Sequence, residues 1–191
     1  MKIICFGDSN SYGYDPRAYF GGRYDADCRW VDILARKGGH ECLNYGQNGR
    51  AIPACEDELL LYKSIFEKEN ADFFIIMLGS NDILMGLSMK AITVRMERLI
   101  RYLPFDRTQI LLVSPPCFEW GDWVESEAQL QSSRDLAENY RQLAQKLGLH
   151  FADAQDWGVR LSHDGVHFTA AGHRAFAQGI YNTIEKIRER S

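Results

Sequence analysis

A serine, a histidine and an aspartate stand in segments whose residue types suit nucleophilic catalysis. Ser9 lies in a Gly-Asp-Ser-Asn run after the first apolar segment, where Gly7 tolerates a backbone shape that a Cβ resists. Asp164 precedes His167 by three residues. In a tight loop Asp164 can accept a hydrogen bond from one ring nitrogen of His167, which leaves the other nitrogen to take the serine proton. A triad is predicted, although turns and helix caps use the same residue types.

Two further loops carry donors for the negative charge that develops on a carbonyl oxygen. The segment 44–50 contains Gly46 and Gly49, which allow backbone N–H groups to point into a cavity. The segment 79–82 contains Asn81, whose side-chain amide would follow a rigid central strand. Taken alone, each loop also fits a turn shaped by glycine and asparagine.

The histidines and cysteines give little support for a metal site. His163, Asp164 and His167 have a spacing that zinc accepts, but no further cluster completes a ligand shell, so we expect no metal. His173 is predicted to be a solvated or capping residue of the last helix. The odd set of five cysteines has no C-x-x-C pair, which argues against a disulfide framework and a zinc knuckle.

The chemistry-bearing loops alternate with apolar segments that predict a parallel sheet. Strands are predicted at 3–6, 41–45, 73–78, 109–114 and 150–152. Helices are predicted at 30–38, 54–70, 88–103, 128–148 and 170–189, with Thr169 as the N-cap of the last and Gly148 as a stop. The continuously apolar run 73–78 indicates a central strand covered on both faces. Loops after parallel strands share one rim of the sheet, where ligands bind.

Length and charge bound the remaining function classes. A chain of 191 residues fits one domain, 1–191. The net charge of -4 argues against nucleic-acid binding, which requires clustered Lys and Arg residues to contact the phosphates. The first apolar run is far shorter than a signal h-region or a membrane span, so we expect a cytoplasmic protein without a membrane partner.

Taken in order, four sequence blocks resemble those of the SGNH hydrolase family, also called GDSL esterases, over nearly the whole chain. The blocks are Gly7-Asp8-Ser9-Asn10, Gly49, Gly79-Ser80-Asn81-Asp82 and Asp164-Gly165-Val166-His167. The resemblance implies a flavodoxin-like α/β/α sandwich with Ser9 as nucleophile and Asp164 and His167 as its partners. It also implies an oxyanion hole made by the backbone N–H of Ser9 with Gly49 and Asn81. Gly49 is chosen over Gly46 for its spacing to Arg50.

Other runs are similar to the arylesterase and acyltransferase branch, which also contains sugar acetylesterases. These include Cys5-Phe6-Gly7-Asp8-Ser9, Arg29-Trp30, Val113-Ser114-Pro115-Pro116 and Gly165-Val166-His167-Phe168-Thr169. Asn10 stands where that branch usually has leucine, and this can alter the pocket. Asn10, Tyr12, Trp120 and Trp123 are candidate substrate contacts; the tryptophans could instead pack on the sheet or at a subunit contact.

These features predict a serine carboxylic ester hydrolase that acts on short acyl groups, acetyl above all, of aryl, alkyl or carbohydrate alcohols. The expected partner is a small-molecule ester, and the mechanism needs no cofactor. A thioesterase, lysophospholipase or acyltransferase is the alternative within the same chemistry. A non-catalytic flavodoxin-like module is the alternative of another class. Similar proteins often assemble, so a homo-oligomer remains open.

Overall fold

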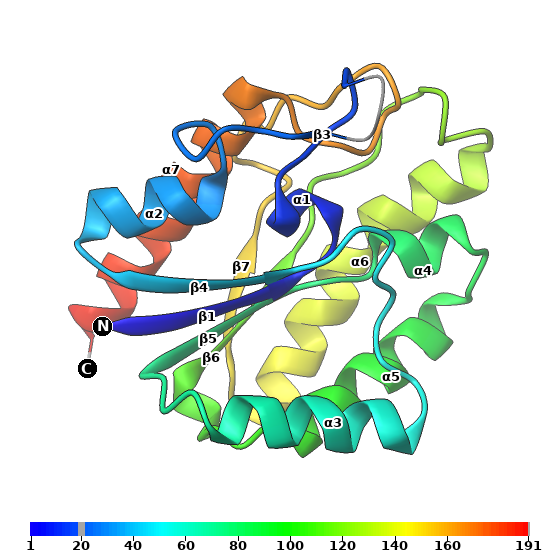
Figure 1. The fold of residues 1–191 in the computed structure, drawn as a ribbon. Coiled ribbons are helices and arrows are strands. Elements are labelled where there is room, and N and C mark those ends of the chain that lie inside the picture. The colour runs from blue at the N-terminus through cyan, green and yellow to red at the C-terminus, as the bar shows by residue number, and fades with distance from the viewer. Residues whose placement is uncertain (19–21, 191) are drawn as a thin grey trace.

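A five-stranded parallel sheet forms the centre of the molecule in the computed structural model, which describes residues 1–18 and 22–190. Its strands, in the order β4-β1-β5-β6-β7, are β1 (Lys2–Gly7), β4 (Glu41–Gly46), β5 (Phe73–Met77), β6 (Ile110–Ser114) and β7 (His150–Asp153). Helices cover both faces (Figure 1). The predicted α/β/α sandwich is confirmed.

Five long helices form the two outer layers. They are α2 (Trp30–Gly38), α3 (Glu56–Glu67), α5 (Met89–Tyr102), α6 (Glu127–Leu147) and α7 (Ala170–Arg188). The predicted strands and helices are all present, with ends shifted by a few residues. Thr169 caps α7 by accepting a hydrogen bond from the Gly172 N–H, and Gly148 ends α6 in the left-handed conformation, as predicted.

The short elements were not predicted. They are α1 (Ser9–Tyr12), α4 (Ser80–Leu84), the 3-10 helix η1 (Arg107–Gln109) and the antiparallel pair β2 (Tyr14–Asp15) and β3 (Gly22–Arg23). Helices this short present no apolar stripe, and their residues are also those of turns. Two of them, α1 and α4, begin directly after β1 and β5 and therefore carry candidate site residues.

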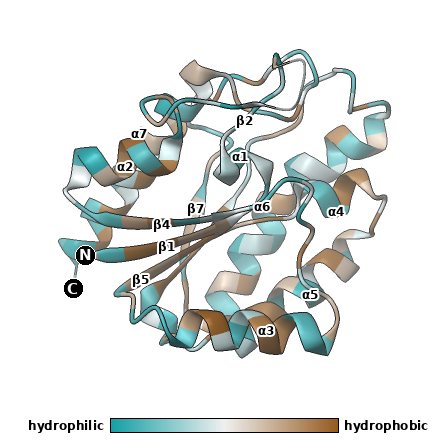
Figure 2. Ribbon diagram, in the orientation of Figure 1, coloured by the Kyte–Doolittle hydropathy of each residue, from teal (hydrophilic) through white to brown (hydrophobic). Residues whose placement is uncertain are grey.

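The apolar core lies on both faces of the sheet because successive side chains of each strand point in opposite directions. Ile4 and Ile76 belong to the cluster that packs under α3, α5 and α6. Ile3 and Ile75 belong to the cluster that packs under α2 and α7, which also holds the buried Trp30. Figure 2 shows the central strand β5 in brown, the colour of hydrophobic residues, whereas the edge strand β4 is partly teal. Each fully buried Ile side chain contributes about 1.5–3 kcal/mol, so the sheet is a rigid support for the loops at its rim.

Within residues 1–18 and 22–190, no helix has the length and apolar character needed to cross a membrane.

Candidate active site

Ser9 is held at the end of β1 by the short helix α1. The Asp8 carboxylate caps this helix, since its Oδ1 accepts a hydrogen bond of 2.9 Å from the Asn10 N–H. Gly13, at φ 89°, ends the helix in the left-handed region that favours glycine. Gly7 lies so close to Ser11 and to the β5 backbone that a Cβ there would collide with both. These contacts fix the Ser9 side chain, which is only 6% exposed.

The loop before α7 brings a histidine and an aspartate to Ser9. The distance from His167 Nε2 to Ser9 Oγ is 2.9 Å, and that from His167 Nδ1 to Asp164 Oδ2 is 2.8 Å. The other carboxylate oxygen, Oδ1, accepts hydrogen bonds of 2.9 Å from the N–H groups of Val166 and His167. The structure thus brings Ser9, His167 and Asp164 into one hydrogen-bonded chain.

The environment of Asp164 keeps its carboxyl group ionised. Burial by itself would raise the pKa, but the hydrogen bonds from the His167 ring and from the two backbone N–H groups outweigh it and hold the pKa below its usual value. An ionised Asp164 accepts a hydrogen bond from the Nδ1–H of His167, which leaves Nε2 without a proton and facing Ser9 Oγ as an acceptor. This arrangement allows His167 to remove the serine proton.

Asp8 has the opposite shift. Burial raises the pKa of the Asp8 carboxyl to about 6, although the Asn10 N–H and the nearby His167 and Arg50 side chains lower it. Asp8, which precedes Ser9 in the chain, therefore holds its charge less firmly than Asp164, which is linked to Ser9 through the His167 ring.

The Asn10 side chain makes structural hydrogen bonds in place of the predicted substrate contact. Its Oδ1 accepts a hydrogen bond of 2.8 Å from the Phe168 N–H, and its Nδ2 donates one of 3.1 Å to the Val166 carbonyl. The side chain is buried, and both ends of its amide are occupied by the loop that carries His167. We therefore correct the prediction: Asn10 joins α1 to this loop.

Three candidate oxyanion donors lie at neighbouring strand ends. Among the described residues, no acceptor is bonded to the N–H of Ser9 or of Gly49. Asn81 Nδ2 donates one hydrogen to the Arg50 carbonyl at 3.0 Å, which leaves its second hydrogen available. By contrast, the Gly46 N–H donates to Asn44 Oδ1 at 2.8 Å. This difference favours Gly49 over Gly46 as the backbone donor.

A cavity of about 150 Å³ opens beside the serine. It is lined by Ser9, Tyr14, Asn48, Gly49, Trp123 and His167. The ring centroids of Tyr14 and Trp123 lie 4.7 and 5.0 Å from that of His167. Trp123 is a predicted contact, whereas Tyr14 and Asn48 were missed. An aromatic residue directly after the turn at Gly13 was the available signal for Tyr14.

Two predicted substrate contacts lie outside the lining of this cavity. The Arg23 guanidinium covers the Tyr12 ring at 4.5 Å from its centroid, and Arg23 Nε donates to the Tyr12 carbonyl. Trp120 is 60% exposed. Gly13 turns the chain so that Tyr14 contacts His167, and Trp123 rather than Trp120 reaches the cavity. The substrate contacts of Tyr12 and Trp120 stay predictions, and neither residue is part of the lining of this cavity.

The loop that carries Trp123 is docked on the loop that carries Asp164. The Trp123 N–H donates to the Asp164 carbonyl at 3.1 Å, and the Glu119 N–H donates to the Gly165 carbonyl at 3.1 Å. Gly121 approaches the Asp164 backbone so closely that a Cβ would collide with it. Trp123 is consequently held in place relative to His167 by backbone contacts.

His173 is a buried residue, and the prediction of a solvated or capping side chain was wrong. Its ring packs against Tyr24 and Phe168, with centroid distances of 5.3 Å to each. Burial lowers the pKa of His173 to about 3, so the ring is neutral. His163, the other histidine of the metal hypothesis, lies beside Asp122, with 3.6 Å from Nε2 to Oδ2. In residues 1–18 and 22–190 no group of three or more metal-ligating side chains comes together.

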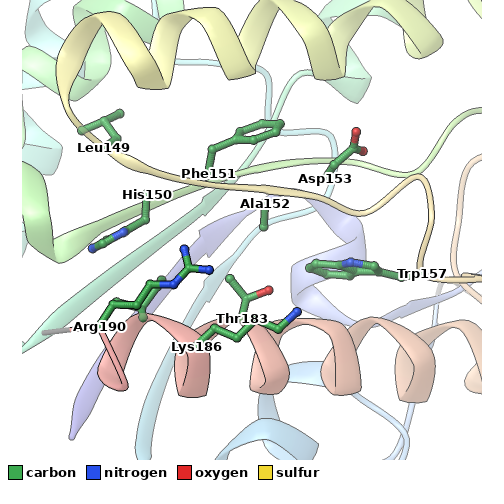
Figure 3. A pocket seen from close by; sticks show the side chains of 10 residues that line it. Leu149, His150, Phe151, Ala152, Asp153, Trp157, Thr183, Lys186 and Arg190 are labelled. Carbon is green, nitrogen blue, oxygen red and sulfur yellow. The ribbon is translucent and has the colours of Figure 1, made fainter.

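A larger cavity, of about 370 Å³, lies between β7 and α7 and shares no residue with the first (Figure 3). It is lined by Leu149, His150, Phe151, Ala152, Asp153, Trp157, Thr183, Lys186, Ile187 and Arg190. None of the predicted catalytic or oxyanion residues is among them.

The sequence matches a family model over most of its length. Residues 5–175 match the GDSL-like Lipase/Acylhydrolase family. The chain therefore belongs to this family, the SGNH or GDSL hydrolases, and is an ester hydrolase. A comparison with curated proteins found no match.

Solved structures with the same fold include esterases. A proposed arylesterase from Agrobacterium tumefaciens is 29% identical with a TM-score of 0.82, over 97% of this chain and 99% of its own. A carbohydrate acetylesterase family member from Sinorhizobium meliloti is 26% identical with a TM-score of 0.80, over 97% and 98%. The inhibitor-bound aryl esterase of M. smegmatis is 25% identical with a TM-score of 0.83, over 97% and 99%. The predicted resemblance is confirmed.

Proposed function

We propose that this protein is a serine carboxylic ester hydrolase that removes short acyl groups, acetyl above all, through an acyl-enzyme on Ser9. The observation that carries the proposal is the buried chain from Asp164 through His167 to Ser9 Oγ, which ends at a small aromatic cavity. A hydrogen-bonded nucleophile and base, with the base oriented by a third group, is the arrangement that acyl transfer requires.

The mechanism uses residues of this chain alone. Ser9 Oγ attacks the ester carbonyl carbon while His167 Nε2 takes the hydroxyl proton. The N–H groups of Ser9 and Gly49 and the second amide hydrogen of Asn81 stabilise the oxyanion. His167 then gives the proton to the departing alcohol, and the acyl group stays on Ser9. A water molecule, deprotonated by His167, attacks the acyl-enzyme and releases the acid.

The cavity supports short acyl chains. Its volume of about 150 Å³ is well below the range of about 300–1,000 Å³ that holds drug-sized ligands. The rings of Tyr14 and Trp123 line it, and both lie against His167. The names of the structural neighbours, aryl esterases and carbohydrate acetylesterases, support aryl and carbohydrate alcohols as leaving groups.

Acyl-chain preference tests the proposal. We expect kcat/KM for nitrophenyl acetate to exceed that for nitrophenyl octanoate, and acetylated sugars to release acetate, with no turnover by Ser9→Ala. Trp123→Ala should raise the octanoate-to-acetate ratio about tenfold because it enlarges the cavity, whereas Trp120→Ala, its matched control, should leave the ratio unchanged. Faster octanoate turnover by the unmodified enzyme would contradict the proposed short-acyl specificity.

The remaining expectations stay predictions. They are a single domain over 1–191, a small-molecule ester as partner, a cytoplasmic location and assembly as a homo-oligomer. The thioesterase, lysophospholipase and acyltransferase functions stay alternatives, since they use the same serine chemistry. The non-catalytic module is set aside, because the chain belongs to a family of ester hydrolases.

A further inference from the structure

Arg50 joins the strand ends beside Ser9 through its side chain. Its Nη1 donates to the Gly7 carbonyl at 2.8 Å and also to the Tyr45 carbonyl, and its Nη2 donates to Gln47 Oε1 at 2.8 Å. Gly7 is the last residue of β1, and Tyr45 belongs to β4. One guanidinium therefore holds the end of the strand that leads into Ser9 against the strand that leads into Gly49.

The backbone around Arg50 is tied to the third strand end. The Arg50 carbonyl accepts a hydrogen bond of 3.0 Å from Asn81 Nδ2, and the Ile52 N–H donates to Asp82 Oδ2 at 3.0 Å. Asn81 and Asp82 lie in α4, which begins soon after β5. Asp82 is fully buried, so this attachment is shielded from water. Arg50 thus contacts all three segments that carry proposed oxyanion donors.

Two aromatic rings enclose the guanidinium. Its Cζ lies 4.4 Å from the centroid of the Phe6 ring and 5.3 Å from that of the Tyr62 ring. Such contacts stabilise a desolvated cation and limit the rotamers that its side chain can take. The planar fork of donors is therefore held in one orientation toward the strand-end carbonyls.

Gly49 depends on its neighbours for its position. At φ 71° it occupies the left-handed region, an added Cβ would meet nothing within 4 Å, and among the described residues its N–H has no acceptor. No contact of Gly49 itself places its N–H beside Ser9. Its neighbours hold this segment: the Gln47 N–H donates to the Gly7 carbonyl at 3.2 Å, and the Arg50 N–H donates to the Gln47 carbonyl at 3.3 Å. The Arg50 side chain adds contacts with two further strand ends.

We propose that Arg50 is a positioning residue that sets the Gly49 N–H in register with the Ser9 N–H and the Asn81 amide, and so completes the oxyanion hole. The inference rests on the proposed function. Arg50 contacts no reacting atom; it acts through the backbone. Because a misplacement of about 1 Å can lower a rate about a hundredfold, this positioning should appear in kcat.

Kinetics of Arg50→Lys test the proposal. Lysine keeps the charge, but its single ammonium group lacks the planar fork that reaches carbonyls of two strands. We expect kcat for nitrophenyl acetate to fall about 10- to 100-fold, with KM changed by less than about twofold, because donors that act mainly in the transition state affect kcat. Arg107→Lys is the matched control, because Arg107 is also partly buried and its Nη1 donates to the Ile100 carbonyl at 2.6 Å. We expect the Arg107→Lys variant to keep the kcat of the unmodified enzyme.

The amide of Gly49 gives a readout that is independent of turnover. In ¹⁵N-glycine-labelled protein, the Gly49 resonance should shift and its amide should exchange faster in Arg50→Lys, but not in Arg107→Lys. If no ester is hydrolysed by the unmodified enzyme and the Gly49 amide still responds, the proposed function fails while the positioning role of Arg50 stands.

Three results would overturn the positioning role. The first is an unchanged kcat in Arg50→Lys, and the second is a Gly49 amide that does not respond. The third result concerns variants that fold poorly. To detect it, Arg50→Gln is measured beside Arg50→Lys, and each kcat is divided by the fraction of active enzyme found by phosphonate titration. If the corrected kcat of both variants equals that of the unmodified enzyme, Arg50 serves folding alone.

Discussion

Two of the cavities among the described residues, the one beside Ser9 and the one between β7 and α7, show that volume and chemical groups do not go together. The cavity beside Ser9 is the smaller, at about 150 Å³, yet His167 and Asp164 beside it are buried and bonded to each other. The cavity between β7 and α7 measures about 370 Å³, but Lys186 and Arg190 on its rim are exposed, and no ion pair joins either of them to another described residue. Buried polar groups that converge on one point therefore indicate a reactive site better than the volume of a cavity does.

Helix α7 belongs to both regions and shows the same contrast. Its first turns contain His173, neutral and buried beneath the loop that carries His167. Lys186 lies in its last turn and Arg190 follows just after its end, where positive charge is favourable beside the C-terminus of a helix. The positive charge of Lys186 and Arg190 is therefore explained by the helix end alone. The buried polar side chains beside Ser9 have no such structural explanation.

The largest expected effect is that of Asp164→Asn. The amide removes the negative charge opposite His167 Nδ1 and disturbs the tautomer that leaves Nε2 as an acceptor. We expect kcat for nitrophenyl acetate to fall about 10³- to 10⁴-fold, the order found when the same change is made in a serine protease. Steady-state kinetics on folded protein measure it; a loss below about tenfold would remove Asp164 from the proposed triad.

Loss of the Asn81 amide should have the next largest effect. Asn81→Ala removes both the proposed oxyanion donor and the hydrogen bond to the Arg50 carbonyl, so we expect kcat to fall about a hundredfold or more. Asn139→Ala is a matched control, since Asn139 Nδ2 likewise donates to a backbone carbonyl, that of Asp135, but on the exposed side of α6. Equal kcat values for the two variants would contradict the proposed donor.

The neutral state of His173 predicts a loss of stability in acid. Its pKa is about 3 when folded and about 6.5 when unfolded, so between these values the unfolded chain binds more protons and stability falls as pH falls. From pH 7 to pH 5 this histidine should cost about 2 kcal/mol. Urea unfolding at pH 7 and pH 5 measures this. The drop in unfolding free energy between the two pH values should be smaller in His173→Gln than in the unmodified protein by about 2 kcal/mol. An identical pH dependence would show that His173 is not held neutral.

The smallest expected effect is at the larger cavity. The double variant Lys186→Ser with Arg190→Ser removes two exposed cations at or just beyond the C-terminal end of α7, whereas the His167 loop precedes the N-terminal end of this helix. We expect kcat/KM for nitrophenyl acetate to change by less than about twofold. A tenfold change would show that the cavity between β7 and α7 is coupled to the site at Ser9.

Long apolar patterns and residue spacing predicted most of the fold. The run 73–78 is apolar on both faces because β5 is central, and this can be read without a structure. The loops that converge on Ser9 could also be named, since each follows a predicted strand or precedes the last helix. Short-range geometry could not: the left-handed Gly13 decides that Tyr14 rather than Tyr12 faces His167.

Burial of polar side chains was equally hidden in the sequence. Asn10 and His173 have residue types that usually face solvent or ligands, and only the tertiary contacts show that one joins α1 to the His167 loop and the other fills the core. Most of the residues that contact Asn10 and His173 are far from them in the sequence, so no local sequence pattern predicts these contacts. Arg50 is similar, because its three acceptors come together only when β1 and β4 pair.

Covalent labelling tests the central claim, that Ser9 is the nucleophile, most directly. The protein would be treated with a fluorophosphonate at neutral pH and the modified peptide identified by mass spectrometry. We predict one adduct, on Ser9, that is absent from Ser9→Ala and strongly slowed in Asp164→Asn. An unlabelled protein, or an adduct on another residue that persists in Ser9→Ala, would contradict the account.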